Sequence, residues 1–303
     1  MDTKHTSIFL AEVSRALLEN AHLNKQALIV DATLGGGGHT KEFLENGTKV
    51  VAFEADPEIF EKTKKDLLSF LEQKRFDSEN LVLINDNFVN LKTNLINLGF
   101  QKIDGAIFDF GISRMHYFDL GRGFSFQNAS EPLDMRINKD SQNVSAADLL
   151  NALPAKELIK LFESVLTYRD TRNLVRNIVE KRKVEPIKTV SNFLDVVKKS
   201  VRGVGEKNPA TESFLALRIA VNSELENIEI ALPQAFELLA SGAKLAAISF
   251  HSLEDKIVKN LFRDWELQEF GEVMTPKPIE PTPNEVKANP SSRSARLRII
   301  RKL

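Results

Sequence analysis

The segment that most constrains the fold is Leu28-Ile-Val-Asp-Ala-Thr-Leu-Gly-Gly-Gly-Gly-His39, an apolar run that ends in an acid and continues into four glycines. Residues 40–45 then have a helical pattern. Because glycine has no Cβ, a ligand can approach the main chain closely at such a loop. A strand, a glycine-rich turn and a helix in this order are typical of the first turn of a nucleotide-binding α/β fold. The sequence therefore predicts an α/β protein with a site for an adenosine-containing cofactor.

A second strand is predicted at 49–53 and is followed by Glu54, 16 residues after Gly38. Nucleotide-binding folds place a ribose-binding carboxylate near this distance. The glycines do not follow the G-x-G-x-x-G spacing of dinucleotide sites, and they lack the Lys-Ser/Thr of a P-loop. NAD, FAD and S-adenosylmethionine all remain compatible with this pattern, as does a tight turn that binds no ligand.

Acidic residues at the ends of successive predicted strands favour S-adenosylmethionine among these cofactors. S-adenosylmethionine carries a positive sulfonium and no phosphate, so carboxylates suit it, whereas a pyrophosphate favours the N-terminus of a helix. Phe88 follows the third strand and could lie against an adenine ring or belong to the core. The acids are Asp31, Glu54, Asp86 and Asp109.

Short apolar segments and the spacing between them predict the domain organisation. The segments are typical of buried parallel strands, and helical patterns between the first four indicate right-handed βαβ units. More than 130 residues, with helical patterns and no convincing strand, separate the fourth segment from the fifth. We therefore expect a Rossmann-like domain formed by 1–113 and 213–303, with an inserted helical domain at 114–212. The predicted strands are 28–31, 49–53, 81–85, 103–110 and 244–250.

The C-terminal part of the chain supports four further expectations. A helix over 213–239 should be bent or broken near Pro233. Ser252-Leu-Glu-Asp255 fits a capping box that begins a helix through Trp265. The segment 274–290 contains five prolines and should be an exposed irregular loop, and the alternation at 295–301 predicts an edge strand.

Composition excludes several classes of protein and site. The chain has no cysteine, so disulfides, thiolate metal sites and a cysteine nucleophile are excluded, and with them methylation of cytosine at carbon 5 through a covalent adduct. His5, His39 and His251 show no spacing typical of a metal site. No apolar run reaches the roughly 18 residues of a membrane span, and the polar N-terminus is unlike a signal peptide. We therefore expect a cytoplasmic protein without a membrane partner.

Basic residues are concentrated in two stretches although the net charge is −1. From Arg169 to Lys207 there are 11 Lys/Arg and 5 Asp/Glu, and from Lys287 to Lys302 there are 6 Lys/Arg and no acid. Such stretches can contact phosphates, or they can be solvated surface. We consider Arg176, Lys181 and Arg182 as candidate contacts to RNA.

The fourth predicted strand leads into Asp109-Phe-Gly-Ile-Ser113, at the sheet edge where α/β folds bind ligands. Amino-group methyltransferases have an acid or Asn followed by a tight turn at this place. Acceptors on the hydrogens of an exocyclic amine localise its lone pair for attack on a methyl-sulfonium, and most of the rate comes from positioning and desolvation. Asp109 and Ser113 are therefore candidate catalytic residues, although Asp109 could also be a simple strand-end cap.

Several long motifs, in the same order over residues 4–300, resemble the RsmH (MraW) family of bacterial small-subunit ribosomal RNA cytosine-N4 methyltransferases. Any one of them could occur by chance, but the ordered set is very specific. They are Asp31-Ala-Thr-Leu-Gly-Gly-Gly-Gly-His39, Arg122-Gly-Phe-Ser-Phe126, Pro132-Leu-Asp-Met-Arg136, Asn208-Pro-Ala-Thr211, Leu217-Arg-Ile-Ala-Val-Asn-Ser-Glu-Leu-Glu226, Ser249-Phe-His-Ser-Leu-Glu-Asp255 and Asn289-Pro-Ser-Ser-Arg-Ser-Ala-Arg-Leu-Arg298.

The resemblance implies a class I, Rossmann-like methyltransferase sheet with an inserted helical domain, and S-adenosylmethionine as methyl donor. It also implies transfer to the N4 amine of a cytidine in the decoding region of 16S-type rRNA, within an assembled or nearly assembled small ribosomal subunit. The oligomeric state, monomer or homodimer, stays open. The residues implied at the cofactor are Gly37, Gly38 and His39 at its methionine end, Glu54 at the ribose, Phe88 on the adenine side, Asp109 at the neighbouring strand end, and His116 closing the pocket.

The chain departs from the family pattern at four places. Glu54-Ala-Asp56 stands where most members have Asp-Arg-Asp, and Arg114 replaces the second serine of a Ser-Ser pair. Tyr168-Arg-Asp-Thr171 replaces Tyr-Gly-Glu-Glu, and Glu212 replaces an arginine. Arg169–Thr171 and Glu212 lie in or beside the insertion, so they concern substrate docking and not the cofactor.

Two functions from other classes share part of this pattern. An NAD-dependent oxidoreductase would share the glycine turn and the ribose acid, but the chain has no second glycine turn for the other mononucleotide half. A non-catalytic ribosome assembly factor would share the fold and the departures at Arg169–Thr171 and Glu212. The intact glycine loop, Glu54 and Asp109 favour an enzyme.

Overall fold

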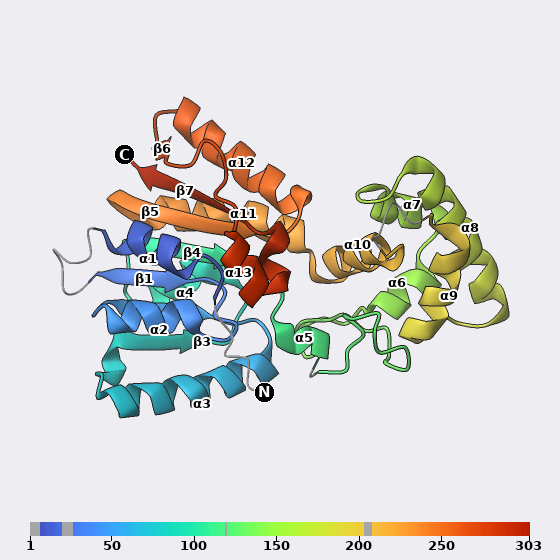
Figure 1. The fold of residues 1–303 in the computed structure, drawn as a ribbon, viewed down its shortest axis with the longest axis horizontal. Coiled ribbons are helices and arrows are strands. Elements are labelled where there is room, and N and C mark those ends of the chain that lie inside the picture. Colours follow the sequence, from blue (N-terminus) through green and yellow to red (C-terminus); the bar gives the residue numbers. More distant parts are fainter. Residues whose placement is uncertain (1–6, 20–26, 119, 203–207) are drawn as a thin grey trace. The chain divides into compact units, whose positions relative to one another are not determined.

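The computed structural model describes residues 7–19, 27–118, 120–202 and 208–303, so His5 lies outside the described residues. The chain divides into two compact units. The first unit consists of Met1–Ile112 and Leu225–Leu303, and the second consists of Ser113–Glu224. Figure 1 shows a sheet with helices on both faces in the first unit, and helices in the second.

The first unit contains a seven-stranded sheet in the order β3-β2-β1-β4-β5-β7-β6. Strands β1 to β5 run parallel to one another, whereas β7 is antiparallel to both β5 and β6. This doubly wound order confirms the Rossmann-like sheet predicted from the sequence. The strands are β1 (Leu28–Asp31), β2 (Lys49–Phe53), β3 (Leu81–Ile84), β4 (Ile103–Asp109), β5 (Leu239–Ser249), β6 (Gly271–Val273) and β7 (Arg296–Lys302).

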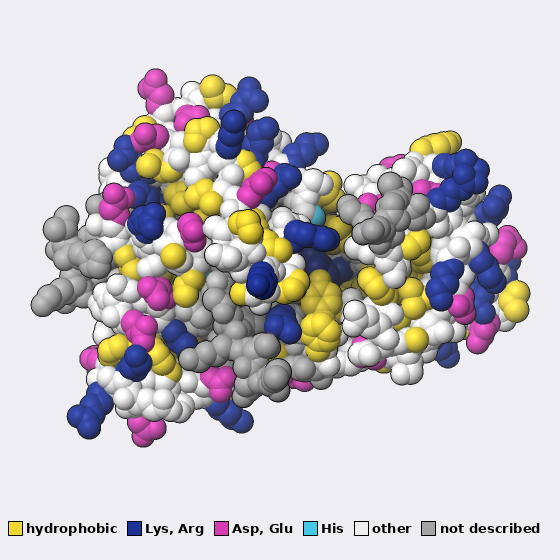
Figure 2. Space-filling model, viewed as in Figure 1, with side chains coloured by type: hydrophobic (Ala, Val, Ile, Leu, Met, Phe, Trp, Pro, Cys, Tyr) yellow, Lys and Arg dark blue, Asp and Glu magenta, His cyan; other side chains and the backbone are white. Residues whose placement is uncertain are grey.

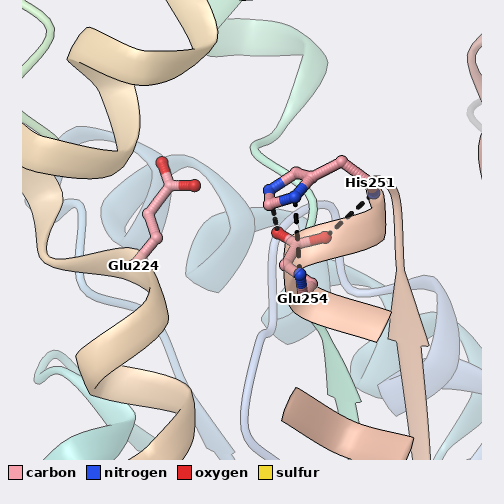
Figure 3. A group of neighbouring side chains, drawn as sticks. All are labelled: Glu224, His251 and Glu254. Carbon is pink, nitrogen blue, oxygen red and sulfur yellow. Dashed lines mark hydrogen bonds and ion pairs between the residues drawn. The ribbon is translucent and has the colours of Figure 1, made fainter. Parts of the chain in front are cut away.

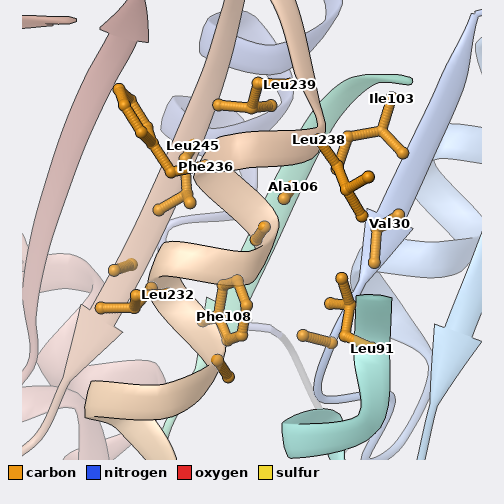
Figure 4. Close-up of a cluster of buried hydrophobic side chains, with 14 of the residues drawn as sticks. Val30, Leu91, Ile103, Ala106, Phe108, Leu232, Phe236, Leu238, Leu239 and Leu245 are labelled. Carbon is orange, nitrogen blue, oxygen red and sulfur yellow. The ribbon is translucent and has the colours of Figure 1, made fainter. Parts of the chain in front are cut away.

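Both faces of the sheet are covered, which is why its strands are apolar without alternation. Val30 and Phe108 face a cluster formed with α4 (Leu91–Asn97), α11 (Glu224–Leu238) and α12 (Ser252–Leu267), part of which is drawn in Figure 4. Neighbouring residues such as Ile29 point to the other face, where they join a second cluster. That cluster includes residues of α1 (Leu10–Leu18), α2 (Gly38–Glu45) and α3 (Pro57–Lys74).

The second unit is helical, with a core of aromatic and aliphatic side chains. Phe193 packs against Phe162, with ring centroids 6.3 Å apart, and against Phe214 at 5.3 Å. The predicted helical insertion ended at 212, but one more helix, α10, belongs with this unit. Its helices are α5 (Arg114–Phe118), α6 (Ala146–Ala152), α7 (Ala155–Glu163), α8 (Tyr168–Val184), α9 (Val190–Ser200) and α10 (Ala210–Asn222).

A long loop of the second unit is held by two of the sequence motifs. The buried Arg122 donates to the carbonyl oxygens of Arg136 and Ile137, the latter at 2.6 Å. Arg136 also pairs with Asp134 at 2.7 Å. Gly123 has φ +72°, and a Cβ there would overlap the carbonyl oxygen of Pro132, so no other residue fits. These residues pin the loop.

Three predictions for the C-terminal part of the chain are wrong. The helix over 213–239 is broken at Ser223, which has φ 49°, and not at Pro233, which lies within α11. Pro233 removes one helical hydrogen bond, but the adjacent Leu232 and Phe236 are buried against the sheet, and that packing outweighs the loss.

The C-terminal strand β7 is not an edge strand, because the three-residue β6 pairs with its outer side. A strand this short has too few residues to show an alternating pattern in the sequence. The proline-rich segment is also not irregular throughout. It contains the helix α13 (Pro283–Ala288), where Pro283 occupies a first-turn position that needs no backbone donor and Thr282 caps the N-terminus.

Among the helices of the described segments, none combines the length and the apolar character needed to cross a bilayer.

Candidate functional site

The glycine loop between β1 and α2 uses conformations that other residues rarely adopt. Gly35 and Gly37 have φ values of +48° and +74°. The Gly37 amide donates to the carbonyl oxygen of Leu34 at 2.7 Å, which closes a tight turn before the helix begins at Gly38. This geometry explains why glycine is required here.

Neighbouring side chains leave little room for a Cβ at Gly37 and Gly38. A Cβ on Gly37 would lie 3.1 Å from Thr63 Cγ2 and 3.3 Å from Leu67 Cδ2, both on α3. A Cβ on Gly38 would overlap the Ser7 hydroxyl. Thr63 also donates through Oγ1 to the Gly35 carbonyl oxygen at 2.6 Å. Helix α3 therefore packs against the loop and supports it. The sequence did not predict this contact.

Glu54 joins the end of β2 to the glycine loop. Its two carboxylate oxygens accept hydrogen bonds from the backbone amides of Gly35, at 3.0 Å, and Asp56, at 2.9 Å. Desolvation by burial raises the pKa of Glu54 to about 7, against the lowering effect of these two hydrogen bonds. The predicted ribose acid is therefore held rigidly beside the loop.

Asp31 and Asp109 end the adjacent strands β1 and β4. Burial raises the pKa of Asp31 to about 6, although the carboxylate accepts a hydrogen bond from Thr40 Oγ1 at 2.7 Å. Burial, and then repulsion from Asp31, raises the pKa of Asp109 to about 7. The Asp109 backbone amide donates to Thr33 Oγ1 at 2.7 Å. The Asp109 Oδ1 atom is buried and has no hydrogen-bond partner among the described residues.

Asp31, Glu54 and Asp109 therefore form a carboxylate cluster at the carboxyl ends of three strands. Repulsion from Asp31 contributes to the raised pKa of both other acids. No Lys or Arg of the described residues forms an ion pair with any of the three. Buried charges are normally paired, so a bound cation would relieve this repulsion and satisfy Asp109 Oδ1. A pyrophosphate would increase the repulsion.

Phe88 and Asp86 follow the next strand, β3. The Phe88 ring is partly exposed and contacts Phe108 and Phe110, with centroids 5.8 and 6.2 Å away. Asp86 accepts hydrogen bonds from Asn87, Asn90 and Asn94, so its carboxylate is already satisfied locally. Phe88 is consistent with both of its interpretations, as part of the core and as a surface for an adenine ring.

His39 is buried at the start of α2 and packs against Phe43, with ring centroids 6.4 Å apart. Desolvation lowers the pKa of His39 to about 4. The imidazole is therefore neutral at physiological pH and would not repel a cationic ligand at the loop.

The two remaining predicted site residues, Ser113 and His116, belong to the second unit. Ser113 Oγ accepts from the backbone amide of Met115 at 3.3 Å, and the carbonyl oxygen of Ser113 accepts from the His116 amide. The buried His116 ring lies edge-on to Phe124, with centroids 5.0 Å apart. The residues that the structure brings together at the glycine loop and strand ends are thus those of the first unit.

His251 follows β5 and is the N-cap of α12. Its Nδ1 accepts from the Glu254 backbone amide at 3.4 Å, while the buried Glu254 carboxylate accepts from the His251 amide (Figure 3). The same carboxylate also accepts from the Phe250 amide. The capping box therefore begins one residue earlier than predicted, because a histidine nitrogen can accept in the way that a serine oxygen does. His251 therefore organises the loop that leads into α12.

The raised pKa values of the cluster predict a pH-dependent affinity for a cationic cofactor. The folded-state pKa values lie above those of the unfolded chain, so ionisation destabilises the folded protein. The free energy of unfolding therefore falls as the pH rises from about 4 to about 7. A cationic cofactor binds favourably only to the ionised forms of these carboxyl groups. If one carboxyl of pKa about 7 must be ionised, we expect the Kd for S-adenosylmethionine to rise about tenfold per pH unit below 7.

Calorimetric titration between pH 5.5 and 8 measures this dependence. S-adenosylhomocysteine, which lacks the sulfonium charge, is the control and should show a weaker dependence. A flat profile for S-adenosylmethionine would contradict the role assigned to the carboxylate cluster.

Comparison with known proteins gives matches over the whole chain. The model of the MraW methylase family matches residues 2–303. A relative from Coprothermobacter proteolyticus named "Ribosomal RNA small subunit methyltransferase H" is 37% identical over 302 residues, covering 99% of this chain and 96% of its own. Relatives of the same name from Leptospira interrogans and Clostridium botulinum are 38% and 33% identical, with 90% and 100% of their lengths covered and 100% of this chain in both cases. The solved structure of an rRNA methylase from Streptococcus thermophilus is 16% identical, covers 97% of this chain and 92% of that one, and has a TM-score of 0.40, too low to bear on function.

Proposed function

The chain belongs to the MraW methylase family, and on that premise we propose that it transfers a methyl group from S-adenosylmethionine to small-subunit ribosomal RNA. The acceptor in this proposal is the exocyclic N4 amine of a cytidine in the decoding region, as the sequence motifs imply. The relatives' shared name supports the coarser part, the class of RNA. The substrate is the small ribosomal subunit, so the protein would work where ribosomes assemble, in the cytoplasm.

The observation that carries the proposal is the carboxylate cluster with the unpartnered Oδ1 of Asp109. The donor set fits the cofactor, because its charge is positive and the cluster is negative. Gly37, Gly38 and His39 would hold the methionine end, and Glu54 would accept hydrogen bonds from the ribose hydroxyls with the lone pairs that its backbone contacts leave open. Phe88 would contact the adenine. When bound, S-adenosylmethionine supplies an electrophilic methyl group on a sulfonium.

Asp109 would act on the acceptor amine. The lone pair of a cytidine amine is drawn into the ring, and an acceptor on one of its hydrogens localises that pair for attack. Asp109 Oδ1 is such an acceptor, because the described residues leave it without a donor. Its pKa of about 7 also suits uptake of the amine proton after the methyl group has been transferred. No covalent intermediate with the protein is needed, consistent with the absence of cysteine.

Three further roles are assigned within the second unit. We assign the helical insertion to substrate recognition. Within it, Ser113 would assist Asp109 at the acceptor and His116 would close over the cofactor.

The carboxylate cluster disfavours the NAD-dependent oxidoreductase, since a pyrophosphate would be repelled by it.

The proposal is tested by methyl transfer from labelled S-adenosylmethionine to purified, unmethylated small ribosomal subunits. Nuclease digestion and mass spectrometry then locate the label. Label on the exocyclic amine of one cytidine supports the proposal. Label at carbon 5, or no label on subunits and naked rRNA despite confirmed cofactor binding, would reject it.

A further inference from the structure

Helix α8 carries a row of arginines on one face. Arg169, Arg172 and Arg176 occupy positions i, i+3 and i+7, which lie on the same side of a helix and here span roughly 10 Å along its axis. All three are exposed, and none forms an ion pair with a described residue. Figure 2 shows Lys and Arg side chains on the surface of the second unit.

Three cations of the segment after α8 lie at the same end of the helix pair α8–α9. The Arg202 backbone amide donates to Asp170 Oδ1 at 3.4 Å, and Asn177 Nδ2 donates to Ser200 Oγ at 2.9 Å. These bonds place the C-terminal end of α9 against the first half of α8. We group the six exposed cations of these neighbouring segments under the name α8–α9 basic face: Arg169, Arg172, Arg176, Lys198, Lys199 and Arg202.

Acids of the same two helices are mostly neutralised elsewhere, so the charge of this face is not balanced. Asp170 is buried and capped by Thr167, while Glu180 pairs with Lys183 and Glu185 with Lys181. Asp195 is an exposed acid of α9 for which no pair forms among the described residues. The six cations of the face are therefore accompanied by one exposed acid of these helices that is unpaired among the described residues, Asp195.

The structure gives different environments to the three residues that the sequence predicted as RNA contacts. Arg182 donates to the carbonyl oxygens of Leu150 and Leu153, at 2.7 and 2.8 Å, and so holds the unit together. Lys181 pairs with Glu185 at 2.7 Å. Arg176 alone of the three is a member of the α8–α9 basic face. Neighbours in sequence thus have unlike roles.

Tyr168 adds an aromatic group to the face. It is the first residue of α8, its side chain is 74% exposed, and the Arg172 guanidinium lies 5.0 Å from its ring centroid. An aromatic ring beside a guanidinium forms a stacking surface for a base, and such surfaces recognise unpaired bases, whose faces are open. Duplex RNA would need the cations but not the ring.

We propose that the α8–α9 basic face binds an unpaired segment of ribosomal RNA, in which one base stacks on Tyr168 and the flanking phosphates contact the arginines and lysines. This inference rests on the proposed function, because it names the part of the substrate that the second unit holds. In this proposal the face positions the small ribosomal subunit on the protein and does not contact the reacting atoms.

The test uses the full chain with S-adenosylhomocysteine and measures binding without turnover. The probes are a fluorescent single-stranded oligoribonucleotide, an RNA hairpin of the same composition, and purified small subunits. Tyr168→Ala should weaken single-strand binding about tenfold, whereas Tyr168→Phe should bind as the parent does. Replacing Arg169, Arg172 and Arg176 together by Ala should reduce the slope of log K against log salt by about 2, since each phosphate contact contributes about 0.7.

A matched control variant replaces Lys160, Lys181 and Lys183 by Ala, which removes the same charge from cations that already pair with glutamates. Thermal unfolding verifies the fold of each variant, and Arg172→Gln replaces the triple variant if that one is misfolded. The inference is overturned if the arginine variants lose no more affinity than the control, or if the hairpin binds as tightly as the single strand. Because no methylation is measured, these outcomes are independent of the reaction assigned above.

Discussion

Replacing Asp109 by asparagine is expected to lower kcat for methyl transfer by about 10²–10³-fold, and to raise the Kd for S-adenosylmethionine by about tenfold at most, because one of the three carboxylates of the cluster is lost. The carboxylate presents a buried Oδ1 that accepts no hydrogen bond from the described residues. Asparagine is nearly isosteric, but it places either a donor or a weaker, neutral acceptor there and cannot take up a proton. The larger part of the loss should therefore fall on the transition state, and the smaller part on cofactor binding.

Single-turnover kinetics on small subunits, with calorimetry for the cofactor, separates the two quantities. Asp104→Asn is the matched control, because Asp104 lies at the opposite end of β4, where it accepts from the Leu28 amide at 2.8 Å. Its substitution should leave kcat within a factor of about two, which is the expectation for a site remote from the chemistry. If the Asp109 variant retains full kcat, Asp109 is a strand-end cap and the proposed role is wrong.

Replacing Glu54 by alanine is expected to raise the Kd for S-adenosylmethionine by about 10²–10³-fold, because two kinds of contact disappear together. The loop loses the carboxylate that holds the amides of Gly35 and Asp56, and the ribose loses its charged acceptor. Hydrogen bonds to charged groups contribute about 1.5–3 kcal/mol each, and 1.4 kcal/mol corresponds to a factor of ten in affinity. Glu54→Gln keeps one acceptor oxygen and should have an intermediate effect.

Calorimetry at pH 8, where the carboxyl group is ionised, measures these affinities. Glu61→Ala provides a control of equal charge change, since Glu61 is an exposed residue of α3 that pairs with Lys64 at 3.8 Å. An unchanged Kd in the Glu54 variant would show that the ribose is bound elsewhere. A parallel fall in melting temperature would assign part of the effect to the loop itself.

Much of the first unit could be predicted because its signals are local. Strands β1 and β2 begin and end where the apolar runs do, and the four glycines and the acids at the strand ends mark the edge of the sheet that carries the site. Pro233 shows the limit of this reasoning. Its local preference predicts a break in the helix, but burial of its neighbours against the sheet is stronger. The break at Ser223 has no comparable signal in the sequence.

The sequence by itself determined the doubly wound sheet, the glycine loop, the position of the acids and the family, because backbone preference and burial are expressed in the order of residues. Tertiary structure alone decided which of these groups is satisfied. Asp86 finds three asparagines nearby, whereas Asp109 Oδ1 finds no donor among the described residues, and Arg182 is used internally while Arg176 is exposed. The partners of a polar side chain often come from distant parts of the chain, as Thr33 does for the amide of Asp109, 76 residues later. Charge, pKa and accessibility depend on those partners, so they emerge only when the fold brings them together.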